Sequence, residues 1–120
     1  MPYNTTLAER LRNMLGRRKG VTEKAMFGGL SFLIDGKMFC GVLKDDLVVR
    51  VNPEDGPGLL KKPHVRPMNF TGKPMAGFLY VSAKGYDNEQ ELKEWAEFSL
   101  AFVSTLPQRK KKRSMYISLS

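Results

Sequence analysis

The amino-acid sequence predicts an α+β domain in which an N-terminal helix and a long C-terminal helix flank an antiparallel β-sheet of about five strands. Apolar residues recur every three or four positions near residues 5–15 and 87–105, which is typical of amphipathic helices. Between these stretches the apolar period changes to two, which is typical of strands with one buried face. Turn-forming residues separate the segments of period two, so the strands are expected to follow one another as a meander.

The first helix is expected over Thr5–Leu15. Asn4 can cap its N-terminus, and Leu7 and Leu11 lie on one face of the helix. Gly16 is expected to end it. The basic residues that follow are favourable beside the negative end of the helix dipole: Arg17, Arg18 and Lys19.

The strands of the meander are expected in four segments: Val21–Phe27, Leu30–Ile34, Met38–Leu43 and Leu47–Val51. Asp35-Gly36 predicts a two-residue hairpin turn, because both positions of such a turn need positive φ. Lys44-Asp45-Asp46 predicts a second turn, and Gly28-Gly29 predicts a bulge or tight bend. Together these segments predict three or four antiparallel strands.

The second half of the chain predicts fewer elements. Residues 54–62 have room for one short helical turn, whereas residues 62–74 contain three prolines and are expected to form an extended connection. Phe78–Ser82 is expected to be a further strand. Asp87 is the expected N-cap of the last helix, which should run to about Thr105.

Length and composition indicate one domain. The chain has 120 residues, with a domain expected over 1–106 and a basic, mobile tail over 107–120. The formal net charge is +8, and the tail bases account for five of those charges: Arg109, Lys110, Lys111, Lys112 and Arg113. A lone cysteine, no leader pattern and no long apolar run favour a reduced, cytoplasmic protein without a membrane partner.

The residues that could carry chemistry do not form a catalytic pattern. Cys40 lies inside a predicted strand, where a buried and inert thiol is the usual role. Asp45 and Asp46 are neighbours in a turn, which does not give two carboxylates different environments. The glycines do not reproduce a phosphate-binding fingerprint, and one His with one Cys supplies too few metal ligands. We therefore predict no enzyme activity, no metal site and no cofactor.

A stiff loop offers a remote alternative as a ligand site. His64 lies among bases and prolines, and nearby cations favour its neutral imidazole. With Arg66 and Lys73 it could line a small-ligand or catalytic pocket. The competing interpretation is that His64 and Arg66 tie the loop to the edge of the sheet or cap a helix.

Basic residues suggest nucleic-acid binding as the main alternative function. The candidate contacts are the tail bases Arg109, Lys110, Lys111, Lys112 and Arg113 together with Arg10, Arg17, Arg18 and Lys19. Capping and solubility are the favoured explanation of the cluster near the first helix, and residues 87–97 are acidic. The strands show no aromatic RNA-binding signature, so nucleic acid is not the favoured partner.

The last helix carries two large aromatic residues. Trp95 and Phe98 could form an aromatic surface for a partner. Trp95 shares a helical stripe with Leu92, Ser99 and Phe102, so packing in the core is the expectation for its side chain.

Three local strings together resemble the N-terminal domain of the TfoX/Sxy family: Val21–Gly29, Phe32–Phe39 and Arg66–Met75. The resemblance extends from about Leu7 to Leu106. It implies a curved antiparallel sheet with flanking helices, similar to small secretion-chaperone folds, and it implies no catalytic residue. The family includes regulators of natural competence, in which this domain precedes a second, C-terminal domain, whereas this sequence ends after the basic tail.

The resemblance and the missing catalytic pattern favour a non-enzymatic regulatory or adaptor module that acts through protein contacts. The expected partner is another protein, with a homodimer left open as an alternative. The sequence does not decide whether an exposed strand edge pairs with a second copy.

Overall fold

The structure is a computed structural model that describes residues 3–16, 18–26, 28–70 and 73–106. The predicted tail, 107–120, lies outside these residues. The helices of the described chain are α1 (Thr5–Leu15), α2 (Gly56–Leu59), α3 (Ala83–Tyr86) and α4 (Glu89–Ser104). Its strands are β1 (Val21–Met26), β2 (Gly29–Ile34), β3 (Lys37–Leu43), β4 (Asp46–Arg50), β5 (Val65–Phe70) and β6 (Lys73–Val81).

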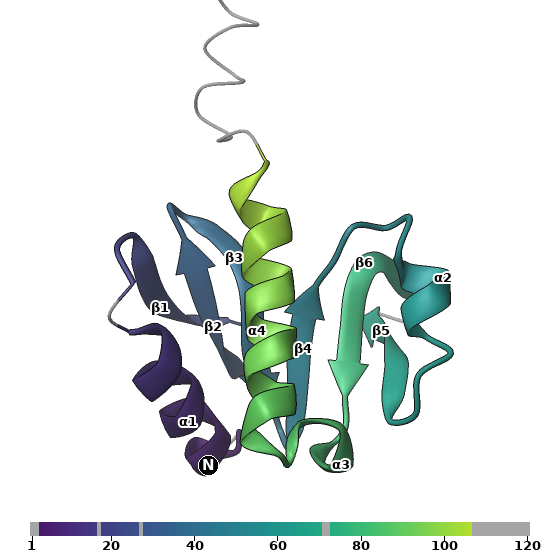
Figure 1. The fold of residues 1–120 in the computed structure, drawn as a ribbon, viewed down its shortest axis with the longest axis horizontal. Helices are drawn as coiled ribbons and strands as arrows, with labels where there is room; N and C mark the ends of the chain where they lie inside the picture. The colour runs from purple at the N-terminus through teal and green to yellow at the C-terminus, as the bar shows by residue number, and fades with distance from the viewer. Residues whose placement is uncertain (1–2, 17, 27, 71–72, 107–120) are drawn as a thin grey trace, which may run out of the picture.

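The described strands form one antiparallel sheet in the order β1-β2-β3-β4-β6-β5 (Figure 1). This architecture confirms the predicted α+β class and the meander, but the sheet has six strands where about five were expected. The additional strand is β5, in the stretch expected to be an extended connection. Pro67 lies inside β5, and proline is tolerated there because β5 forms one edge of the sheet.

The hairpin between β2 and β3 turns where the sequence predicts it. Asp35 and Gly36 have φ angles of 51° and 84°, as a turn with two positive φ positions requires. A register shift follows Phe32 in this pair of strands, and Phe39 and Cys40 are both buried although they are neighbours in β3.

Helix boundaries agree closely with the predicted caps, with one correction. The Asn4 side chain accepts a hydrogen bond of 3.0 Å from the Leu7 amide, and Gly16 is the C-cap of α1. The N-cap of α4 is Asn88, not Asp87, because the Asn88 side chain accepts from the amides of the first turn. Asp87 instead follows α3, a single turn that the sequence analysis did not predict.

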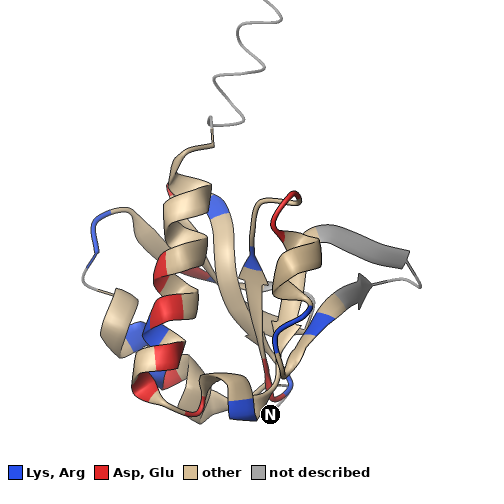
Figure 2. Cartoon of the chain, turned by 45° about the vertical axis from the view of Figure 1, so that its right-hand side comes forward, with Lys and Arg blue, Asp and Glu red and all other residues tan. Residues whose placement is uncertain are grey.

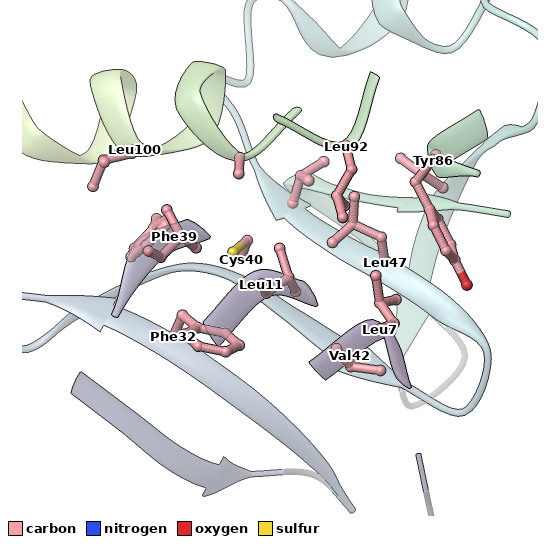
Figure 3. Packing of buried hydrophobic residues seen from close by; sticks show 14 of the residues in the cluster. Leu7, Leu11, Phe32, Phe39, Cys40, Val42, Leu47, Tyr86, Leu92 and Leu100 are labelled. Atoms are coloured by element: carbon pink, nitrogen blue, oxygen red, sulfur yellow. The ribbon is translucent and has the colours of Figure 1, made fainter. Parts of the chain in front are cut away.

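The helices cover one face of the sheet, with α1 beside α4 (Figure 1). Each described helix reaches the core from that face, with Leu7 and Leu11 from α1, Leu59 from α2, Tyr86 from α3 and Leu92 from α4. Figure 3 shows Leu7, Leu11, Tyr86 and Leu92 among the buried side chains of the core. The main strand residues of the core are Leu30, Phe32, Phe39, Cys40, Val42, Leu47, Val49, Leu79 and Val81.

The other face of the sheet carries the side chains that alternate with these core residues. On the central strands of the described sheet they are Val48 and Arg50 of β4 and Phe78 and Tyr80 of β6. We call this side of the sheet the open face, because the described helices all pack on the opposite side.

Candidate interaction surfaces

The start of α4 is bound to α1 by Arg10. Its guanidinium donates to Glu89 Oε1 at 3.0 Å and to the backbone oxygens of Tyr86 and Asp87 at 3.2 and 3.1 Å. One planar group therefore satisfies the carbonyls between α3 and α4 and pairs with a carboxylate in the first turn of α4. Figure 2 shows the acidic side of α4 next to basic residues of α1.

A second ion pair joins the same regions about two helical turns further along α4, between Arg18 and Glu97. Between the two pairs lies an open groove of about 430 Å³, lined by Met14, Arg18, Glu89, Gln90, Lys93 and Glu97. Its charged lining carries both signs, so a strongly charged ligand would meet a like charge there.

These contacts bear on the basic residues considered for nucleic-acid binding. Arg10 and Arg18 are paired with carboxylates within the chain, whereas Lys19 is exposed. Arg17 and the tail bases Arg109–Arg113 lie outside the described residues. Within the described residues, the basic cluster beside α1 therefore helps to hold the two long helices together.

Arg12 makes the best-aligned ion pair of this region. Its Nε and Nη2 donate to the two carboxylate oxygens of Glu23 at 2.7 and 2.8 Å. These hydrogen bonds, with the attraction between the charges, lower the pKa of Glu23 and raise that of Arg12. The pair ties α1 to the edge strand β1.

The loop residues proposed as a ligand site are not brought to one place. His64 is exposed, with a φ of 67°, and its carbonyl accepts a hydrogen bond of 2.8 Å from the Ser82 amide. That backbone bond ties the end of the loop to the end of β6, which is an interior strand of the sheet. The backbone of Lys73 pairs with Phe70 at the other end of β5, about 17 Å from Val65 for a six-residue strand.

Arg66 is placed on the open face instead. Its guanidinium carbon lies 5.1 Å from the centre of the Tyr80 ring, and its Nη2 reaches Asp46 at 2.7 Å. Because β6 lies between β4 and β5, the guanidinium crosses above β6 and covers the ring.

A matching pair lies two residues along β6. Arg50 and Phe78 are partners in the β4–β6 register, with the guanidinium carbon 5.7 Å from the centre of the ring. The sequence alone does not reveal these pairs, because the cations come from β4 and β5 and meet the rings only in the folded sheet. The alternation of Phe78 and Tyr80 was their one local signal.

The outer side of α4 carries an aromatic stripe. Phe98 is 42% exposed, while Trp95 and Phe102 are partly buried and pack against the core. The spacing of these residues, i, i+3 and i+7, places them along one side of the helix. We call these three residues the α4 stripe.

Cys40 has the properties of a core residue. The side chain is fully buried, and burial raises the pKa of its thiol far above the ordinary value. Among the described residues, no group of three or more His, Cys, Asp or Glu is placed to hold a metal ion. No described helix is both long enough and apolar enough to cross a membrane.

Comparison with protein families gives a match to the TfoX N-terminal domain over residues 13–103, about three quarters of the chain. The chain belongs to the TfoX N-terminal domain family. The matched residues run from α1 to the last turn of α4 and include every described strand. This family is linked to competence regulation and is not a known enzyme family. Comparisons with curated proteins and with solved structures gave no significant match.

Proposed function

We propose that this TfoX N-terminal domain protein is a non-enzymatic regulatory or adaptor module that acts through protein contacts. The family's link to competence regulation supports a regulatory role. The single observation that carries the protein-contact part is the α4 stripe, in which a large apolar side chain is 42% exposed on a regular helix.

The chemistry of the stripe suits a protein partner. A ridge with i, i+3 and i+7 anchors is a recurring way for a helix to fit an apolar groove. Trp95 and Phe102 already pack against the core, so a partner that covers the stripe restricts little more of the freedom of these two side chains. Exposed Glu91 and Glu94 lie on the same outer side, which favours a partner with an apolar site and a basic rim.

Substitution of the exposed aromatic tests this proposal. Phe98→Glu is compared with Leu60→Glu, because Leu60 is the other exposed large hydrophobic of the described chain and lies outside α4. Both variants are compared with the wild type by quantitative pull-down from the source cells and by sedimentation velocity. We expect Phe98→Glu to abolish the main specific partner or self-association and Leu60→Glu to retain it.

Two results would contradict the proposal. One is a wild-type chain that neither binds a partner nor self-associates at micromolar concentration. The other is equal binding by both variants, since the stripe would then not be the contact surface. Circular dichroism of Phe98→Glu separates loss of binding from loss of folding.

Nucleic-acid binding through basic residues is the second candidate function, favoured by the net charge of +8 and by the exposure of Lys19. Its test is a salt series of DNA and RNA binding on the full chain and on a chain with Arg109–Arg113 changed to glutamine. Binding that falls steeply with salt and disappears with the tail charges supports this function. No binding at low salt, or no change in the tail variant, rules out its tail form.

A further inference from the structure

Helix α4 carries four carboxylates, which divide into two pairs by their surroundings. Glu89 and Glu97 each form an ion pair with an arginine of the α1 region. Glu91 and Glu94 are exposed, and among the described residues neither forms an ion pair. Glu94 accepts a hydrogen bond of 3.2 Å from the Gln90 side chain. The outer side of α4 therefore carries two carboxylates that no described cation pairs with.

These two carboxylates lie in line with the α4 stripe. Positions 91, 94, 98, 102 and 105 follow one another at spacings of three or four, so they share one side of the helix. From the C-terminal end of α4, this line passes the rings of Phe102 and Phe98 and then reaches the two carboxylates. It therefore presents aromatic surface first and negative charge further along.

The chain carries the complementary chemistry directly after α4. The last described residue is Leu106, whose carbonyl accepts a hydrogen bond of 2.5 Å from the Lys37 side chain. This bond to β3 fixes the point from which the following residues extend. Five consecutive bases, Arg109–Arg113, begin three positions later. Their cationic groups and apolar stems suit both aromatic rings and carboxylates.

The length of this segment matches the line on α4. On the helix, Phe98 is about 12 Å from Leu106, and the two carboxylates are about 18 and 22 Å from it. An extended chain that turned back at Leu106 would bring Arg109 about 10 Å and Arg113 about 23 Å along the helix. If residues 107 and 108 form the turn, the bases span about 3–17 Å. Either path places cations beside Phe98 and within side-chain reach of a carboxylate.

Tethering makes weak contacts sufficient here. A single exposed ion pair contributes little, and salt screens it. A segment joined to its site by a short linker, however, meets that site at an effective concentration on the order of millimolar. Several weak contacts together can therefore keep the segment docked at low salt, and high salt should release it.

The charges of this surface argue against other occupants. A nucleic-acid phosphate would meet the carboxylates of α4 as like charges. The outer side of α4 in a second copy would bring the same carboxylates against one another. A basic segment of another protein has suitable chemistry but lacks the tether.

We propose that the basic segment Arg109–Arg113 folds back over the outer side of α4 in the same chain, where its cations pair with Glu91 and Glu94 and its side chains cover Phe98. The segment then occupies the surface proposed above for a protein partner, and a partner has to displace it. This regulation rests on the proposed function, whereas the docking itself needs no partner.

Trp95, the single tryptophan of the chain, reports whether the α4 stripe is covered. Acrylamide, an uncharged quencher, is added to the full chain and to the variant with Arg109–Arg113 changed to glutamine. At low salt the tryptophan of the full chain should be quenched less than that of the variant, and at high salt this difference should disappear. Equal quenching of the two chains at low salt would overturn the proposal.

Substitution of the carboxylates tests the site on α4. Glu91→Gln combined with Glu94→Gln removes two charges from its outer side. Glu54→Gln combined with Asp55→Asn is the matched control, because these two acids are also exposed but lie outside α4. At low salt the first double variant should be quenched as strongly as the tail variant, and the control as weakly as the wild type. Equal quenching of the two double variants would overturn the proposal, and circular dichroism verifies that both are folded.

A spin label shows where the segment lies and to which chain it belongs. Cys40 is fully buried, so Ser114→Cys supplies the reactive thiol of the folded chain. At low salt the label should broaden the backbone amide signals of Glu91 and Glu94 more than that of Arg66 in the edge strand β5. The same broadening in a mixture of spin-labelled chains with separate isotope-labelled chains would come from a second copy and would overturn docking within one chain.

The quenching and spin-label measurements use the chain by itself, so they are independent of any partner. Docking in a chain that binds no partner would support this inference and contradict the proposed function. A partner that needs Phe98, together with no docking of Arg109–Arg113, would support the proposed function and overturn this inference.

Discussion

The guanidinium of Arg12 in α1 donates two hydrogen bonds, of 2.7 and 2.8 Å, to the carboxylate of Glu23 in β1. The pair is well aligned, but both side chains are partly exposed. Alignment strengthens the bonds, whereas solvent screens the attraction between the charges. We therefore expect a modest contribution to stability that depends on pH.

The first prediction concerns Glu23→Gln. The pKa of Glu23 is lower in the folded chain than in the unfolded chain, so its stabilising effect is present above the ordinary pKa of glutamate and is lost as pH falls through the folded pKa. We expect Glu23→Gln to lower the free energy of unfolding by about 0.5 kcal/mol at neutral pH. Urea denaturation should show this difference shrinking in acid, and a difference that grows in acid would contradict the assignment.

The second prediction concerns Arg10, whose guanidinium serves two backbone carbonyls as well as Glu89. A lysine ammonium cannot reproduce this planar arrangement. We expect Arg10→Lys to lower the free energy of unfolding by about 1 kcal/mol and Arg10→Ala by about 2 kcal/mol. Chemical denaturation measures both, with exposed Lys61→Ala as a control near zero. A lysine variant as stable as the wild type would show that the positive charge alone is enough to hold α1 against the start of α4.

The third prediction compares two glycines of the sheet. Gly36 has a φ of 84° and open space around it, whereas a Cβ on Gly41 would lie 2.6 Å from the Leu30 carbonyl oxygen. Gly36→Ala should therefore destabilise the protein by about 1 kcal/mol through the left-handed backbone alone. Gly41→Ala should destabilise it more, by about 2–3 kcal/mol, because the strands must shift. The reverse order in urea denaturation would contradict this account.

Local sequence signals correctly predicted the helix ends and turns that depend on residues close together in the chain. Asn4 and Gly16 bound α1 as expected, and Asp35-Gly36 forms the expected turn. Strand β5 was missed because prolines argue against a strand, and only its position at the sheet edge makes Pro67 acceptable. The shift of the α4 N-cap from Asp87 to Asn88 depends on α3, which has no strong signal of its own.

The contacts of the candidate surfaces could be predicted from the sequence even less well than the helices and strands. The sequence singled out Arg10, Arg18 and Arg66 as bases, but it could not show that each meets a carboxylate distant along the chain. Cross-strand register decides which side chains share a face. That register depends on the whole sheet, so the pairing of Arg50 with Phe78 and of Arg66 with Tyr80 emerges only from the folded structure.

The last prediction concerns Cys40, which is fully buried in the core between the sheet and α4. Burial raises the pKa of its thiol, so the folded chain keeps the proton while the unfolded chain loses it above about pH 8.5. Stability should therefore fall as pH rises past that value, and Cys40→Ala, although less stable at neutral pH, should lack this part of the decline. Urea denaturation across the alkaline range measures the difference, and a disulfide reagent should label the thiol only when the chain unfolds. Rapid labelling of the folded chain would show that the thiol is accessible and would remove the basis for this pH dependence.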